Sequence, residues 1–194
     1  MTCFAYGTKI KTNRGDVRIE ELQPGDKVLT RDNGYQPLRR ISECALTARQ
    51  QLDNPHLRPV MVQVGAFGDN LPVRDTVMSP NMRLTVIEAS QGILARENET
   101  LVPMKHLVDH KGVQQIDTMQ VTYFHLGFAR HQVVAANGLW AEVFQPNDRS
   151  LGVIGNAQRL EALELFPELA QHCRPPRDVP VVKRVNRLKF ASGF

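Results

Sequence analysis

Met1-Thr2-Cys3-Phe4-Ala5-Tyr6-Gly7-Thr8-Lys9-Ile10 is the stretch on which the interpretation of this sequence depends. It places a cysteine near the start of the chain, a glycine four residues later, and then alternating polar and apolar residues. Such alternation is typical of a strand with one buried face. The thiol of Cys3 is placed to attack the peptide bond before it, Thr2–Cys3. We therefore take Cys3 as a candidate nucleophile.

The composition is that of an ordinary globular protein, with 42% hydrophobic and 23% charged residues among 194. This length accommodates one hydrophobic core, or one core and an appendage. The sequence has no apolar run long enough to span a bilayer and no secretory signal pattern at its N-terminus. We therefore expect no membrane partner, and either a cytoplasmic location or export by a non-classical route.

The positive charge is concentrated at the C-terminal end. Residues 174–194 hold six Lys or Arg and one acid, Asp178, which is enough to account for the net charge of +4. A nucleic-acid-binding fold carries its basic residues on the folded surface, so nucleic acid is a disfavoured partner. A protein partner that contacts this basic tail remains an open alternative.

The three cysteines are Cys3, Cys44 and Cys173, which are widely spaced and form no Cys-x-x-Cys pair. This pattern predicts thiols rather than a disulfide framework or a zinc site. His106 and His110 have the i, i+4 spacing of a helical zinc pair, but no third ligand stands near them. We therefore predict no metal and no cofactor.

Turn signals divide residues 7–143 into many short apolar or alternating runs. They are Asn13–Asp16, Pro24–Asp26, Asp32–Gly34 and Asn137-Gly138. We interpret residues 46–59 as a loop. Short strands without a strand–helix–strand rhythm predict an all-β domain.

The composition changes after Phe144. Leu160, Leu163 and Phe166 have helical spacing in a segment that Asn156 is suited to cap. We therefore divide the chain into a β-domain over residues 1–144 and a C-terminal extension over residues 145–194. The extension is predicted to be partly helical and to end in the basic tail.

Three separated motifs carry a resemblance to a known family. Cys-Phe-x-x-Gly-Thr-x-Ile-x-Thr at Cys3, with Gly25-Asp26 and the Asp32–Gly34 turn, resembles the start of the Hint (Hedgehog/intein) domains, especially their bacterial intein-like branch. Pro72–Pro80 resembles the segment that carries the family's Thr/Ser-x-x-His motif, and Val121–Gly138 resembles its C-terminal block. The resemblance covers roughly residues 3–144 and implies a horseshoe-like β-fold.

The resemblance also implies a reaction. In such domains the first thiol attacks the preceding carbonyl and converts the amide to a thioester, which a second nucleophile then cleaves. A free thiol has a pKa of about 8.5, and the departing amide nitrogen needs a proton. The substrate would be the chain's own N-terminal flanking peptide, cut at Thr2–Cys3. Ser79, Asp75 and His131 are the residues that the motifs suggest as helpers of Cys3.

Three positions depart from the family pattern. Met82 stands where the motif has its histidine, and Ala141 and Glu142 stand where a splicing intein has its final His-Asn. Loss of a general acid–base typically slows a reaction by about 10² to 10⁴. We therefore expect N-terminal cleavage that is slow or impaired, and no splicing. The alternative is a catalytically degenerate Hint fold that serves as a binding or structural module.

The C-terminal block contains two histidines, His125 and His131. His131 matches the histidine of that block and is a candidate to orient the Cys3 thiol, although a histidine beside an apolar strand is as often an ordinary polar residue. For His125 the sequence favours a structural role.

Overall fold

The computed structural model describes residues 2–88, 98–143 and 188–190, in which the regular secondary structure is mostly β-strand with one short α-helix. The predicted all-β fold is thus confirmed. The strands are β1 (Phe4–Ala5), β2 (Lys9–Thr12), β3 (Gly15–Arg18), β4 (Lys27–Thr30), β5 (Gly34–Pro37), β6 (Arg40–Thr47), β7 (Val60–Val62), β8 (Thr76–Met78), β9 (Arg83–Glu88), β10 (Asn98–Pro103), β11 (Val113–Gln115), β12 (Gln120–Gly127), β13 (Gln132–Ala136), β14 (Leu139–Val143) and β15 (Leu188–Phe190). No helix in the described part of the chain is long and apolar enough to cross a membrane.

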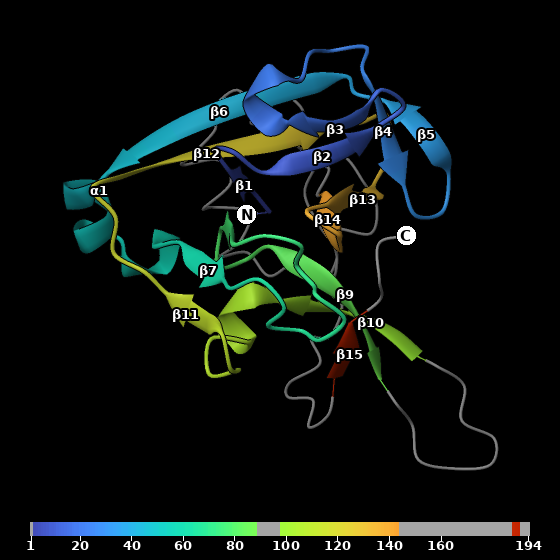
Figure 1. The fold of residues 1–194 in the computed structure, drawn as a ribbon. Helices are drawn as coiled ribbons and strands as arrows, with labels where there is room; N and C mark the ends of the chain where they lie inside the picture. Colours follow the sequence, from blue (N-terminus) through green and yellow to red (C-terminus); the bar gives the residue numbers. More distant parts are fainter. Residues whose placement is uncertain (1, 89–97, 144–187, 191–194) are drawn as a thin grey trace, which may run out of the picture.

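The strands form two open sheets that do not close into a barrel (Figure 1). The first has six strands in the order β11-β7-β8-β1-β12-β6. The second has nine, with β10-β9-β14-β13-β2-β4-β5 as its path and β3 and β15 added at its sides. Neighbouring strands are antiparallel throughout the described pairings, as expected where tight turns rather than helices connect them.

The N-terminal hairpins follow the turn chemistry of the sequence. β2 pairs with β3 across the turn at Asn13-Arg14, and β4 pairs with β5 across Asp32-Asn33. Gly34 has φ +61°, a left-handed conformation that favours glycine. The hairpins expected from these signals are present.

Residues 46–59 are not the loop that we expected. β6 continues to Thr47, and the α-helix α1 (Ala48–Asp53) and the 3₁₀ turn η2 (Pro55–Leu57) follow it. Thr47 and Gln50 form a capping box, in which each side chain bonds to the other residue's backbone N–H. This motif stabilises the helix start although the segment has few apolar residues. Two further 3₁₀ turns are η1 (Ile19–Glu21) and η3 (Met104–His106).

The short strand β1 lies in the middle of the first sheet (Figure 1), between β8 and β12. Its two faces belong to different parts of the core. Phe4 packs in the large core cluster with residues of both sheets, whereas Cys3 and Ala5 pack in a smaller cluster with Tyr123. Because successive side chains of a strand point to opposite faces, the Cys3 side chain lies on the face away from the large core cluster.

The C-terminal extension is described only at β15, which pairs with β9. The helix predicted near residues 157–166 and most of the basic tail lie outside the described residues. The division at residue 144 remains a prediction.

Candidate active site

Strand pairing places Cys3 beside His125. Phe4 pairs with Phe124 and Ala5 with Tyr123, so the same register continued by one residue sets Cys3 opposite His125. Tyr6 N–H donates to the Thr122 carbonyl at 3.0 Å. Because hydrogen-bonded and non-hydrogen-bonded pairs alternate, Cys3 and His125 fall in a non-hydrogen-bonded position, where side chains on one face lie closest.

The Thr2–Cys3 peptide bond is held at both of its polar atoms. His125 Nδ1 lies 3.2 Å from the Thr2 carbonyl oxygen. A carbonyl oxygen only accepts hydrogen bonds, so Nδ1 carries the hydrogen. On the other side of the bond, Cys3 N–H donates to Ser79 Oγ at 3.0 Å. Ser79 N–H donates in return to the Cys3 carbonyl at 3.0 Å. Thr2, Cys3, Ser79 and His125 are all buried.

The backbone around Ser79 is fixed by a tight turn. Met82 N–H donates to the Ser79 carbonyl at 3.0 Å, which closes a turn from Ser79 to Met82. The Met82 side chain is fully buried and packs in the large core cluster with Met78, Leu84 and Met104. An apolar thioether thus occupies the position at which the family motif has a histidine.

His131 lies in a different set of contacts. Its Nε2 donates to Glu142 Oε1 at 2.9 Å, and Glu142 Oε2 lies 3.5 Å from Arg83 Nη1. The Glu142 side chain is 6% exposed and that of Arg83 13%, so the carboxylate is buried between two cationic or potentially cationic groups. This Arg83–Glu142–His131 cluster joins β14 to the start of β9.

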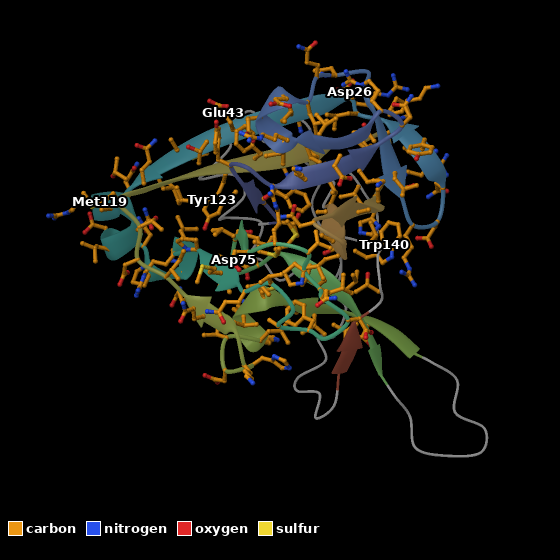
Figure 2. All side chains as sticks on the ribbon, viewed as in Figure 1. Asp26, Glu43, Asp75, Met119, Tyr123 and Trp140 are labelled. Carbon is orange, nitrogen blue, oxygen red and sulfur yellow. The ribbon has the colours of Figure 1, made fainter. Side chains whose placement is uncertain are left out.

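Asp75 holds a loop. Its Oδ1 accepts a hydrogen bond from Val64 N–H at 2.8 Å, and the residue is exposed. Figure 2 shows Asp75 near β7, well apart from Trp140 on β14.

Tyr123 on β12 packs in the same small cluster as Cys3 (Figure 2). The Tyr123 hydroxyl donates to the Leu57 carbonyl at 2.9 Å, which ties β12 to η2.

Asn137 connects the two sheets through its side chain. Its Oδ1 accepts from Lys9 N–H at 3.0 Å, and its Nδ2 donates to Thr76 Oγ1 at 2.9 Å. Its backbone has φ +47°, which asparagine tolerates better than most residues. These bonds fix the start of β2, the start of β8 and the turn after β13 against one another.

Of the residues suggested by the sequence, the structure brings Ser79 directly to the Thr2–Cys3 bond. It shows His131 bonded to Glu142 and Asp75 bonded to a loop amide. His125 contacts the Thr2 carbonyl, although the sequence favoured a structural role for it. The signal that identifies it is the register of β1 against β12, which joins positions about 120 residues apart.

The remaining histidine pair has its own surroundings. The His110 ring packs edge-on against Phe67 with centroids 5.8 Å apart. Partial burial, and secondarily the charge of Lys105, lowers the pKa of His106 below its usual value. Within residues 2–88, 98–143 and 188–190, no group of three or more His, Cys, Asp or Glu side chains is arranged to hold a metal ion.

The sequence profile of the Hint domain matches residues 2–148. A search of curated protein sequences found no match.

Among solved structures, a bacterial intein-like domain from Clostridium thermocellum is similar at 17% identity and a TM-score of 0.43, over 74% of this chain and 99% of that one. The gp41-1 intein is similar at 11% identity and a TM-score of 0.41, over 72% of this chain and 97% of that one.

Proposed function

The chain belongs to the Hint domain family, and from this premise we propose that it is an autoprocessing domain that cleaves its N-terminal flanking peptide through a thioester at Cys3. The main support for the proposal is that two side chains contact the polar atoms of one peptide bond, Thr2–Cys3. His125 Nδ1 bonds to the Thr2 carbonyl and Ser79 Oγ accepts from the Cys3 amide. Both partners are buried side chains. In an ordinary strand, the backbone N–H and C=O groups of neighbouring strands would bond to these atoms instead.

The first step is an N-to-S acyl shift. Cys3 Sγ bonds to the Thr2 carbonyl carbon, negative charge develops on the Thr2 oxygen, and the bond from that carbon to the Cys3 nitrogen breaks. The thiol loses one proton and the departing nitrogen gains one, so that no net proton is consumed. His125 Nδ1–H is placed to stabilise the developing charge, as a donor of an oxyanion hole does.

The second step is attack on the thioester by water or an added thiol. This releases the flanking peptide and regenerates the Cys3 thiol. Thr2 and Cys3 are 6% and 0% exposed, so a nucleophile from solvent has little access to the thioester carbon. A thiolate is a much stronger nucleophile than water, so a small external thiol should accelerate release in spite of this burial.

The shift is slow because the proton needed by the Cys3 nitrogen has no donor at position 82. Methionine transfers no proton, and its side chain is held in the apolar core. Ser79 accepts from the Cys3 N–H and so positions the nitrogen, but a neutral serine is a weak acid. The family's C-terminal step also lacks its groups, because Ala141 and Glu142 replace the histidine and asparagine. Cleavage without splicing is the resulting activity.

The test is a reporter protein fused before Thr2, followed by intact mass with and without dithiothreitol. The proposal expects thiol-dependent release of the reporter over hours to days, and none from the Cys3→Ala fusion. A fusion that stays whole for days with thiol, like its Cys3→Ala control, would contradict it.

A second candidate function is a degenerate Hint domain retained as a binding or structural module. The full burial of Met82 and the locked Arg83–Glu142–His131 cluster favour it, because packing and ion pairing occupy positions at which the family pattern has catalytic groups. An inert fusion that still captures a specific protein through residues 174–194 would support this candidate. Release of the reporter by thiol would exclude it as the sole function.

A further inference from the structure

Strand β9 receives different neighbours along its two sides. On one side β10 pairs with it along its whole length, from Arg83 opposite Pro103 to Glu88 opposite Asn98. On the other side β14 pairs at a single register position, Leu84. The part of this second edge from Val86 to Glu88 is therefore left for another strand.

That strand is β15, from the far end of the chain. Leu188 pairs with Glu88, Lys189 with Ile87 and Phe190 with Val86, in antiparallel register. Figure 1 shows β15 beside β9, at the end of the molecule away from α1. A sheet edge presents unpaired N–H and C=O groups to any extended segment that fits, so this edge is a surface for strand addition.

We propose that the β9 edge over Val86–Glu88 is a strand-docking surface, and that its intermolecular partner is the Leu188–Phe190 segment of a second copy of this chain. Three features support that occupant. The edge already pairs in register with this sequence. Every copy carries both the edge and the strand. The 44 residues between Val143 and Leu188 span at most about 150 Å when fully extended, which is enough to reach a neighbouring molecule.

Exchange gives a strand-swapped dimer in which each β15 completes the partner's sheet. A strand tethered to its own sheet competes with the same strand from another copy. Exchange is therefore expected to increase with protein concentration, and after unfolding and refolding at high concentration. It requires no chemistry at Cys3 and is independent of the proposed cleavage.

Cross-linking of register partners tests the proposal. All variants carry Cys3→Ala, Cys44→Ala and Cys173→Ala, so that only introduced thiols react and self-cleavage cannot occur. One copy carries Ile87→Cys and a second, differently tagged copy carries Lys189→Cys. Directly paired residues in an antiparallel sheet have Cα atoms about 4.5–5.5 Å apart, within the range of a disulfide.

The expected result is a disulfide-linked heterodimer in the mixed sample, at least tenfold more abundant than in a control pair of Ile87→Cys with Asp16→Cys on the distant β3. Deleting residues 188–194 from the Ile87→Cys copy removes its own competing strand and should increase the yield. A single copy with both Ile87→Cys and Lys189→Cys should cross-link internally. Internal linkage with no heterodimer would overturn the exchange, and no linkage in either arrangement would overturn the docking surface itself.

Discussion

Replacing His125 with phenylalanine removes one hydrogen bond to the Thr2 carbonyl and keeps a planar aromatic ring in the site. His125 is 1% exposed, and its Nδ1 lies 3.2 Å from that oxygen. Removing one donor from an oxyanion hole typically costs about 10²–10³ in rate, or about 2.7–4 kcal/mol of transition-state stabilisation. We expect the His125→Phe variant to release an N-terminal reporter at least 100-fold more slowly under saturating dithiothreitol.

A matched variant separates the hydrogen bond from packing. The side-chain amide nitrogen of asparagine lies close to the position of histidine Nδ1, so His125→Asn keeps a donor near the Thr2 oxygen. It should retain a rate within about tenfold of the parent. His131→Phe breaks the bond to Glu142 and leaves the Thr2–Cys3 contacts intact, so it serves as the control for loss of a histidine elsewhere.

The assay is the first-order rate of reporter release by intact mass, with thermal unfolding of each variant as the check on folding. Removing this hydrogen bond from the buried Thr2 carbonyl should also lower the free energy of unfolding by about 1–3 kcal/mol. The reasoning is refuted if folded His125→Phe releases the reporter within twofold of the parent rate, or if His131→Phe causes the larger loss.

Four further substitutions test neighbouring parts of the account. Ser79→Ala removes the acceptor of the Cys3 N–H and should slow reporter release about 5- to 10-fold, the effect of roughly 1 kcal/mol for one buried hydrogen bond; faster release would show that Ser79 stabilises the ground state instead. Met82→His restores a proton donor and should raise the release rate by about 10²-fold while lowering the unfolding temperature, because the site is apolar; an unchanged rate in folded protein would count against the proposed defect. Glu142→Gln leaves the Arg83 charge buried without its carboxylate and should cost about 3 kcal/mol in urea unfolding, with release unchanged; unaltered stability would show that the cluster is not stabilising. Gly138→Ala forces a Cβ within 2.9 Å of Leu71 Cδ2 at φ +84°, and should destabilise the fold by about 1–3 kcal/mol, whereas a neutral effect in the same titration would mean that the turn relaxes freely.

Local signals in the sequence predicted much of the fold. The Asp32–Gly34 turn and the Asn137-Gly138 turn both specify hairpins through residues that accept positive φ, and both hairpins are present. Helix α1 was missed because its segment lacks an apolar stripe, although the capping box of Thr47 and Gln50 is a readable start signal. β15 was missed because three residues carry no periodicity.

The candidate site shows where sequence reasoning ends. Cys3 and Ser79 were brought together by motif spacing, and the structure places Ser79 Oγ on the Cys3 amide. The position of His125 depends on the register between β1 and β12, and a slip of one residue would turn the imidazole to the other face. No local pattern specifies a register between strands that are more than 110 residues apart, so the contact of His125 with the Thr2 carbonyl could not be predicted from the sequence.

Whether a thioester forms at Cys3 can be read from the chemical identity of the flank end that hydroxylamine releases. Hydroxylamine attacks a thioester at its carbonyl, so a peptide fused before Thr2 should leave with a hydroxamate on Thr2, and Cys3 should become the new N-terminus. Mass spectrometry of both products reads these ends. The account predicts a Thr2 hydroxamate from the parent and none from Cys3→Ala. An uncut parent, or a hydroxamate formed equally without the Cys3 thiol, would contradict it.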